Sequence, residues 1–479
     1  MSLEKKLILA AILACNIMGA VEITIVTTAM PSIVKDLSGF DLSSYVFSIF
    51  LLTSVLSTTI FGKLSDIYGK KILFQVSTFI FLISSLLCGL SKNMEFLIFS
   101  RALQGIGNGA LATLTLAVIG DVFEVEERAL VTGYTSTAWS LASLVGPLLG
   151  GIILLRLSWH WIFYINIPFA LISMYLIHKH YNVETKKTDE NLDIKGLVFI
   201  TLFILFLIQS MNGIEKYGFI SLNVLGQLLL SLLFLMIFVR VEKKAKHPMI
   251  PYKLFSKEIA IVLIITFFNS SVLIAIDVYN PSFIQSVQGY LPIYSTFTIL
   301  PLSGAWVVSA FILSRLISKF STKQILTVSL LLICIGSIGL VFLNKDSNLL
   351  HIALSSIIIG LGFGGSYSTL LFVVQETLSK ENMGIASGMV LFVRNLGQTL
   401  GISAFGVILN SCVYKYFRNL NIKINMSTLL ENKALSKVDV SNSLFIGYNR
   451  IYIICVMLSI FCVLMACLLP KNKKLGDYN

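Results

Sequence analysis

Charged side chains are scarce in this sequence. Only 13% of its 479 residues are Asp, Glu, Lys or Arg, whereas ordinary soluble domains contain about 25%. Hydrophobic residues make up 56% of the chain, and the mean hydropathy is +0.87. This composition excludes an ordinary soluble globular protein. It indicates a polytopic membrane protein with the lipid bilayer as a partner.

Patterns that bind metals or carry out hydrolysis are also missing. The seven cysteines all lie in apolar runs and none forms a CxxC pair, so neither a metal site nor a disulfide framework is indicated. The chain contains no HExxH motif, no paired-aspartate metal motif, and no constellation of Ser, His and Asp at membrane depth. We therefore expect no metal, no cofactor and no enzymatic activity.

Long apolar runs dominate what is present. They predict an all-α polytopic membrane protein with fourteen membrane-spanning helices. The predicted spans are Leu7–Met30, Tyr45–Phe61, Ile72–Leu90, Met94–Ile119, Ala129–Leu155, Trp161–Ile177, Gly196–Met211, Phe219–Val239, Ile259–Ile284, Pro292–Leu313, Gln324–Leu343, Leu349–Val374, Gly384–Val413 and Tyr448–Leu469.

Lysine and arginine residues decide the expected orientation. If the N-terminus is cytoplasmic, 23 of the 36 basic residues lie in cytoplasmic segments, 11 lie outside, and two (Arg101 and Arg394) lie within spans. Six of the 11 lie in or beside the one long outer loop, 411–447. The positive-inside rule therefore places both termini in the cytoplasm. The same rule explains the net charge of +12 without nucleic-acid binding.

One acid stands deep in the first span. Glu22 lies well inside Leu7–Met30, and Pro31 is expected to close this span. The run is too long for a cleaved signal peptide, and Ala29-Met30-Pro31 is a poor cleavage site. A charged side chain near the middle of a bilayer costs about 3 kcal/mol or more, so it usually faces a partner or a water-filled cavity. Glu22 could be an acid paired at a helix interface, or it could bind protons or cations.

A shift of 255 positions uncovers an internal repeat. Six of the eight glycines between Arg101 and Gly151 fall on glycines of the second half, whereas 32 glycines in 479 residues predict about 0.5 by chance. The shift also carries Glu22 onto Asp277, which predicts two acids at corresponding depths. Parallel repeats of this kind occur in transporters that bind substrate between two halves. The predicted domains are a six-helix bundle over 1–178, two inserted helices over 179–257, a second six-helix bundle over 258–470 that includes the outer loop 411–447, and a tail over 471–479.

The cytoplasmic turn after the second span carries a recognisable motif. Its sequence is Gly62-Lys63-Leu64-Ser65-Asp66-Ile67-Tyr68-Gly69-Lys70-Lys71. The two glycines allow a tight turn, and Asp66 is expected at the positive end of the next helix. The run resembles the G-x-L-x-D-x-x-G-[RK]-[RK] signature of the major facilitator superfamily. We expect Asp66, together with Arg128 in the next cytoplasmic loop, to latch an inner gate.

Two later runs resemble further signatures of this superfamily. Arg101-Ala102-Leu103-Gln104-Gly105-Ile106-Gly107 is similar to R-x-x-Q-G-x-G, whose arginine is associated with proton transfer in the family. Arg101 could instead snorkel to the outer face. Gly146-Pro147-Leu148-Leu149-Gly150-Gly151 is similar to G-P-x-x-G-G, which in the family marks exporters that work by antiport. A proline flanked by glycines kinks a helix and lets it pack closely on a neighbour.

The first and sixth spans resemble one subgroup of the superfamily. The run from Met18 to Pro31 is similar to the first-span motif of fourteen-span drug:proton antiporters, which usually have Asp at the place of Glu22. Trp159-His160-Trp161-Ile162-Phe163-Tyr164-Ile165-Asn166-Ile167-Pro168 resembles W-R-W-x-F-x-I-N-x-P. The resemblance covers essentially the whole chain. It implies two pseudo-symmetric six-helix bundles plus two inserted helices, and a multidrug efflux pump driven by the proton gradient.

On this basis we hypothesise a mechanism of exchange. Glu22 and Asp277 would bind protons when the cavity faces outside and release them to the cytoplasm, with Arg101 assisting release. A lipophilic cation is a second way to neutralise these acids, so cationic or zwitterionic drugs fit the site. Five further side chains could line a pocket for flat hydrophobic molecules, although packing or lipid-facing roles are equally open for them. They are Trp139, Asn269, Tyr279, Asn280 and Tyr367.

Other interpretations stay open. The exported substrate could be a metal-tetracycline complex, a fatty acid or a peptide. A uniporter or importer of the same fold would lack the export direction that Gly146-Pro147 implies. Arg394 lies at the repeat position of Trp139, and the sequence does not assign its role. We expect a monomer in the inner or plasma membrane of a bacterium.

Overall fold

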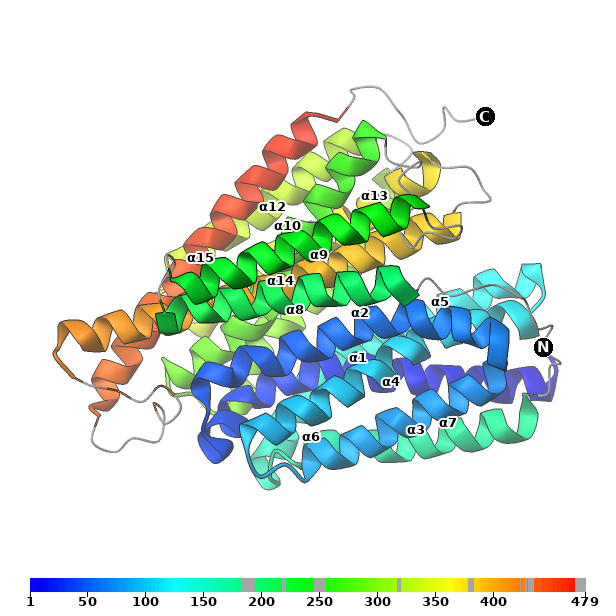
Figure 1. The fold of residues 1–479 in the computed structure, drawn as a ribbon, viewed down its shortest axis with the longest axis horizontal. Helices are drawn as coiled ribbons and strands as arrows, with labels where there is room; N and C mark the ends of the chain where they lie inside the picture. The colour runs from blue at the N-terminus through cyan, green and yellow to red at the C-terminus, as the bar shows by residue number, and fades with distance from the viewer. Residues whose placement is uncertain are drawn as a thin grey trace. The chain divides into compact units, whose positions relative to one another are not determined.

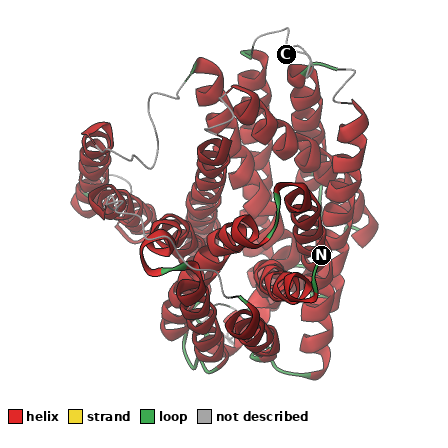
Figure 2. Cartoon of the chain, turned by 90° about the vertical axis from the view of Figure 1, so that its right-hand side faces the viewer, coloured by secondary structure: helices red, strands yellow, loops and turns green. Residues whose placement is uncertain are grey.

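The computed structural model describes residues 1–181, 194–217, 221–244, 256–316, 320–377, 383–422 and 435–469, with the single positions 424, 426 and 429. Within these residues the regular structure is helical and includes no strand (Figure 2). The predicted tail 471–479 lies outside the described residues.

Fourteen helices of fifteen residues or more occur in the described part of the chain (Figure 1). In the first part they are α1 (Leu3–Leu37), α2 (Ser43–Tyr68), α3 (Lys70–Gly89), α4 (Met94–Val122), α5 (Val125–Arg156), α7 (Asn166–His180), α8 (Ile194–Tyr217) and α9 (Leu222–Lys244). In the second part they are α10 (Lys257–Ser286), α11 (Thr296–Leu316), α12 (Thr322–Val341), α13 (Leu349–Thr377), α14 (Met383–Asn419) and α15 (Lys437–Cys467). The four-residue α6 (Trp161–Tyr164) leads into α7.

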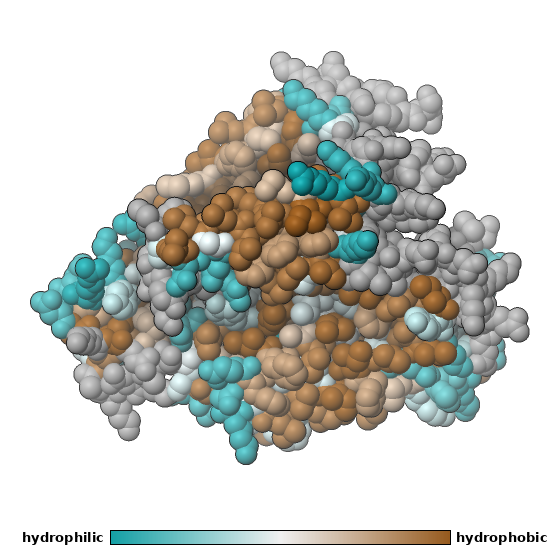
Figure 3. Space-filling view, viewed as in Figure 1, coloured by the Kyte–Doolittle hydropathy of each residue, from teal (hydrophilic) through white to brown (hydrophobic). Residues whose placement is uncertain are grey.

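Each predicted span corresponds to one of these long helices, so the predicted fold class is confirmed. Eleven helices in the described residues are long and apolar enough to cross a membrane. Two more, α5 and α8, contain the shorter apolar segments Leu141–Arg156 and Val198–Ser210. Apolar side chains cover most of the helical surface in Figure 3, and hydrophilic ones gather mainly near helix ends. This distribution suits helices whose sides face lipid.

The chain divides into two compact units. Unit 1 consists of Met1–Leu207 and Gly226–Met249, and unit 2 of Ile208–Leu225 and Ile250–Asn479. The two inserted helices α8 and α9 are shared between the units. The division into two six-helix bundles and a separate insertion stays a prediction.

Small residues let α4 approach its neighbours in unit 1. A side-chain carbon added at Gly105 or Gly109 would overlap the backbone of α2 at Phe50 or Ser54. One added at Gly107 would lie 2.8 Å from the backbone nitrogen of Phe81 in α3. Glycines of this spacing are typical of close helix contacts in membranes, where no hydrophobic effect drives helices together.

The internal repeat is visible in the packing of each unit taken by itself. A shift of 255 carries the ends of α4 onto the ends of α13 (Leu349–Thr377). The glycines keep their partners as well. Gly360 and Gly364 meet the backbone of α11, and Gly362 meets α12 at Ser329 and Ile333. The sequence repeat is therefore a repeat of close helix contacts.

The first span is longer than expected, because α1 passes through Pro31 and ends at Leu37. The expectation that Pro31 closes the helix is wrong. Proline removes one backbone hydrogen bond but is tolerated in membrane helices. The turn beyond it buries Ile33 (0% exposed) and Val34 (3% exposed), and this apolar burial holds the helix together. The chain then turns at Ser38 and Gly39, both with positive φ.

The predicted outer loop 411–447 is shorter in the structure. Helix α14 continues to Asn419 and α15 begins at Lys437. The two extensions are joined by Tyr416, whose hydroxyl lies 3.1 Å from Asp439 Oδ1 and accepts a hydrogen bond from Asn442 at 3.2 Å. This polar contact, which the hydropathy pattern does not predict, supports both helices beyond their apolar segments.

Candidate functional site

The intramembrane acid of unit 1 forms a buried ion pair. Glu22 of α1 and Arg101 of α4 are 0% and 1% exposed, and Arg101 Nη1 donates to Glu22 Oε1. Arg101 also donates to Gln104 Oε1 at 2.7 Å and to the Val46 carbonyl at 3.3 Å. Its guanidinium carbon lies 4.0 Å from the centre of the Phe50 ring. Arg101 therefore turns inward, and the alternative that it snorkels to the outer face is excluded.

A third element completes the environment of Glu22. Asn166, the first residue of α7, donates from Nδ2 to Glu22 Oε2 at 2.5 Å. Gln104, which accepts from Arg101, donates in turn to Ser85 at 2.9 Å. Both carboxylate oxygens of Glu22 thus have donors, as a buried charge requires. Gln104 and Asn166 were not predicted as site residues. Both lie inside the quoted motifs, and this position in a motif is the signal that could have identified them.

The acid of unit 2 has a different environment. Asp277 on α10 is partly exposed, and among the described residues no hydrogen bond or ion pair engages its carboxylate. Asn280 lies one turn later on the same face of the helix. It is 1% exposed, and neither its Oδ1 nor its Nδ2 has a hydrogen-bond partner in the described part of the chain. An unsatisfied buried polar group costs about 1–3 kcal/mol, so the Asn280 side chain destabilises this segment of α10.

The two acids stand at similar distances from the starts of their helices, 19 residues for Glu22 and 20 for Asp277, but at different distances from the other ends. Glu22 precedes Pro31 by nine residues, whereas Asp277 precedes Pro281 by four. Each proline precedes a positive-φ glycine, Gly39 or Gly289, by eight residues. Measured from this shared helix end, Asp277 lies five residues closer, or about 7.5 Å at the helical rise. This difference arises because α10 ends nine residues after Asp277, whereas α1 ends 15 residues after Glu22. The corresponding depth of the two acids stays a prediction.

The residues predicted to line a pocket have packing partners within their own units. Asn269 donates to Ser366 at 3.1 Å, and the Tyr367 hydroxyl donates to Ser270 at 2.8 Å. The Tyr279 ring lies 6.5 Å from that of Phe405 and 6.0 Å from that of Tyr448. Trp139 is 38% exposed, with its ring edge against Gly19.

Arg394 of α14 is the second guanidinium within a span. Its guanidinium carbon lies 4.4 Å from the centre of the Tyr367 ring and 5.8 Å from that of Trp306. No carboxylate among the described residues forms an ion pair with it. A cation–π contact contributes about 0.5–2 kcal/mol, while an arginine at membrane depth costs about 3 kcal/mol or more. The rings therefore offset only part of the cost.

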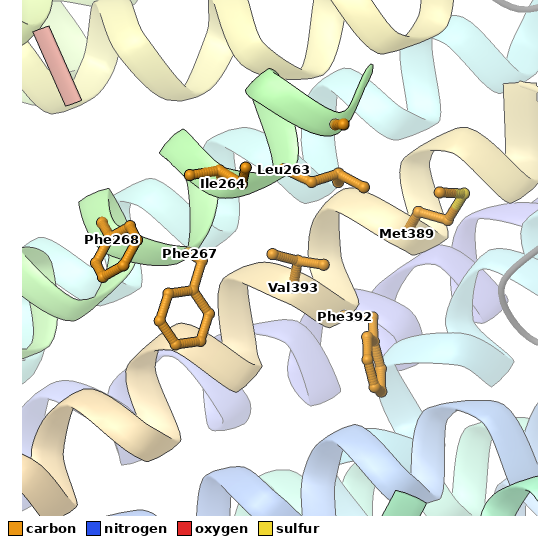
Figure 4. A pocket seen from close by; sticks show the side chains of 8 residues that line it. Leu263, Ile264, Phe267, Phe268, Met389, Phe392 and Val393 are labelled. Atoms are coloured by element: carbon orange, nitrogen blue, oxygen red, sulfur yellow. The ribbon is translucent and has the colours of Figure 1, made fainter. Parts of the chain in front are cut away.

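The structure also contains an apolar pocket between α10 and α14, with a volume of about 340 Å³. Figure 4 shows aromatic side chains from both helices around it. None of the predicted pocket residues lines it. Its lining is Ala260, Leu263, Ile264, Phe267, Phe268, Met389, Phe392 and Val393. The volume is near the lower end for small-molecule sites, and the lining suits an apolar group.

Comparison with known proteins shows the family. The model of the Major Facilitator Superfamily matches residues 12–402. The chain belongs to this superfamily. It is 32% identical over 405 residues to Multidrug resistance protein 3 of Bacillus subtilis (strain 168), covering 84% of this chain and 79% of the relative. It is also 32% identical over 410 residues to the multidrug efflux pump SdrM of Staphylococcus aureus (strain N315), covering 85% and 90%.

Solved structures agree on the superfamily fold. A bacterial homologue of the human lysosomal transporter Spinster, in an inward-facing and unoccupied conformation, matches with a TM-score of 0.70 and 13% identity, over 98% of both chains. An auto-inhibited peptide transporter of the POT family matches with a TM-score of 0.69 and 12% identity, over 100% of this chain and 99% of that one. Family and fold make this protein a multi-pass membrane transporter rather than an enzyme.

The superfamily signature after the second span lies mostly inside α2. Gly62 and Asp66 are helical, so Asp66 does not stand at the start of the next helix as expected. Gly69 alone separates α2 from α3 and has φ +96, a conformation that favours glycine. Lys70 then pairs with Asp121 of α4 at 2.6 Å. The signature thus ties α3 to the end of α4.

Parts of the predicted gate lie outside the described side chains. The Asp66 and Arg128 side chains are not among those described, so their latch stays a prediction, as does a gating role for Lys71. The contact that sequence analysis missed is the one made by Asp121, whose second oxygen accepts from the Tyr181 hydroxyl at 2.8 Å.

The antiporter signature of the superfamily packs α5 onto α1. A side-chain carbon at Gly146 would overlap Thr24, and one at Gly150 would lie 3.0 Å from Ile25. Pro147 lies inside α5, and Gly151 is buried. The motif therefore brings α5 against the helical turn that follows Glu22, which explains why small residues are needed there.

A polar cluster of Lys5 and Glu127 lies at the start of α5. Lys5 Nζ lies 2.6 Å from Glu127 Oε2, and this hydrogen bond holds the pKa of Glu127 below its usual value of 4.5. A lowered folded-state pKa stabilises the protein above the unfolded-state pKa, and the contribution is lost as pH falls through the folded value. We expect Glu127→Gln to lower the thermal midpoint at pH 7 but not at a pH well under 4.5. Lys5→Gln should reproduce this pH profile, and an equal loss at both pH values would contradict the assignment.

Proposed function

We propose that this transporter exports hydrophobic cationic or zwitterionic drugs from the cytoplasm in exchange for protons by alternating access. Relatives at 32% identity that bear multidrug resistance and efflux names support drug export. The observation that carries the coupling hypothesis is the buried pair of Glu22 and Arg101, because a fully buried intramembrane ion pair is a functional-site hypothesis by default.

The two carboxylates, Glu22 and Asp277, would have different roles in transport. Glu22, with its oxygens held by Arg101 and Asn166, is arranged as the proton-free form. Protonating it would break this pair and release the helix contact between α1 and α4. Asp277, which is partly exposed and has no described partner, is available to a cationic group of the substrate. Each proton that crosses 100 mV supplies about 2.3 kcal/mol, which adds to the pH gradient.

We infer a bacterial plasma membrane, both termini in the cytoplasm, and a monomeric transporter. The basic residues of the short segments support this orientation. The antiporter signature at Gly146 and Pro147 supports export over import or uniport.

Dye-driven proton release in everted membrane vesicles tests this function. When the lumen of the everted vesicles is acidic, adding rhodamine 123 to wild-type vesicles should raise the internal pH, because protons leave the lumen as dye enters. Asp277→Asn is expected to weaken dye affinity about tenfold, and Asp439→Asn, which alters an acid outside the apolar segments, serves as the control. Wild type that moves dye without protons would indicate a uniporter. Wild type that moves no dye but exchanges protons with a fatty acid, a peptide or a metal-tetracycline complex would change the substrate class.

A further inference from the structure

Arg394 has an environment unlike that of the other arginine within a span. Arg101 donates to a carboxylate, an amide and a backbone carbonyl, and it is 1% exposed. Arg394 is partly exposed, and its described contacts are the faces of two aromatic rings. A guanidinium has five N–H donors and cannot be deprotonated in a protein. In the described part of unit 2, those of Arg394 have no acceptor.

The aromatic rings next to Arg394 form a stacked platform. The Trp306 and Tyr367 rings are stacked with centroids 5.3 Å apart and planes 9° apart. Phe363 stacks on both, at 5.7 Å and 6.0 Å. The hydrogen bond from Tyr367 to Ser270 fixes the platform to α10. A guanidinium that stacks on aromatic rings can still donate from its N–H groups to an anion.

Asp277 is a carboxylate of opposite charge in the same unit. Within the described residues Arg394 and Asp277 form no ion pair, whereas Glu22 and Arg101 of unit 1 are in contact. Asn280, whose two polar atoms have no partner among the described residues, lies one turn from Asp277. Unit 2 therefore holds one open cation and one open anion within its apolar helices.

We propose that Arg394 is an anion-binding residue of the substrate site, and that it selects flat aromatic substrates with an acidic group beside their positive charge. The guanidinium edge binds the substrate carboxylate through two parallel N–H···O bonds, the Trp306 and Tyr367 platform orients the guanidinium, and Asp277 takes the cationic end. This inference rests on the proposed function, since it assigns the substrate class of the same transporter.

Rhodamine 110 and rhodamine 123 test the proposal as a matched pair. They share a flat xanthylium cation, and differ in that the first carries a free carboxylate and the second its methyl ester. Binding of each dye to the purified full-length protein is measured by fluorescence polarisation. We expect Arg394→Gln to lower the affinity ratio of rhodamine 110 to rhodamine 123 about tenfold, the effect of losing one charge-assisted bidentate contact. Arg394→Lys should recover part of the ratio, because lysine keeps the positive charge but cannot form two parallel N–H···O bonds.

The ratio separates recognition from folding. A variant that is merely misfolded loses affinity for both dyes alike, so its affinity ratio stays unchanged. If Arg394→Gln and Arg394→Lys both lose the two dyes in this way, the proposal is overturned. Tyr367→Leu removes the ring next to Arg394 and should lower the ratio. An Arg394→Gln ratio equal to that of wild type contradicts the proposal. Absence of dye-coupled proton movement in wild-type vesicles contradicts the proposed function instead, since the binding ratio does not depend on a proton gradient.

Discussion

Replacing Glu22 with glutamine is expected to abolish proton-coupled transport and to destabilise the folded protein. Glutamine keeps the shape of the side chain but cannot exchange a proton. It also leaves the buried Arg101 without a carboxylate partner among the described residues, which otherwise offer it Gln104, the Val46 carbonyl and the Phe50 ring. Breaking a buried ion pair by removing one partner costs about 3–5 kcal/mol. Dye-driven proton release should fall at least about 100-fold, the factor that corresponds to about 2.7 kcal/mol.

The double variant Glu22→Gln/Arg101→Gln separates coupling from stability. It removes both charges, so the thermal midpoint should recover toward that of wild type, because a buried pair is often worth little relative to neutral residues. Proton release should stay absent. Glu22→Asp keeps a carboxylate and should retain part of the exchange. If the double variant coupled dye to protons as wild type does, the pair would be structural and the coupling group would lie elsewhere.

Adding one methyl group at Gly109 is expected to disrupt unit 1. The new carbon would overlap the backbone carbonyl of Ser54 in α2, and a backbone atom cannot rotate away as a side chain can. Overpacking of this kind costs about 1–3 kcal/mol and sometimes more. Gly109→Ala should therefore lower the thermal midpoint of the purified protein by several degrees and reduce its yield.

Gly120→Ala is the matched control on the same helix. An added carbon at Gly120 meets no atom within 4 Å, so the change should stay within about 0.5 kcal/mol of wild type. Gly364→Ala, at the repeat position in α13, should behave like Gly109→Ala, because its added carbon would lie 2.5 Å from the Trp306 carbonyl. Equal midpoints for Gly109→Ala and Gly120→Ala would show that the α2–α4 contact can adjust.

Local patterns were sufficient to predict the fold. Apolar runs have the period and length of spanning helices, so each long helix was expected from its own residues. The glycine repeat at a shift of 255 indicated close packing of both α4 and α13, because small residues such as glycine are typical of close helix contacts. Helix ends were less certain. Pro31 and the segment after Asn410 looked like boundaries, but the burial of Ile33 and the contact of Tyr416 with Asp439 extended the helices.

The sequence by itself determined that Glu22 needs a partner or a water-filled cavity, because a carboxylate at membrane depth that has neither is too costly. Only the tertiary structure decided which partners it has. Arg101 and Asn166 are 79 and 144 residues away along the chain, and no local pattern links such positions. The same holds for the two arginines within spans. The sequence places Arg101 in a family signature and gives Arg394 no role, but it does not predict the contacts of either residue. Packing places Arg101 on a carboxylate and Arg394 on a stack of rings, because what pairs with a buried charge depends on which helices meet.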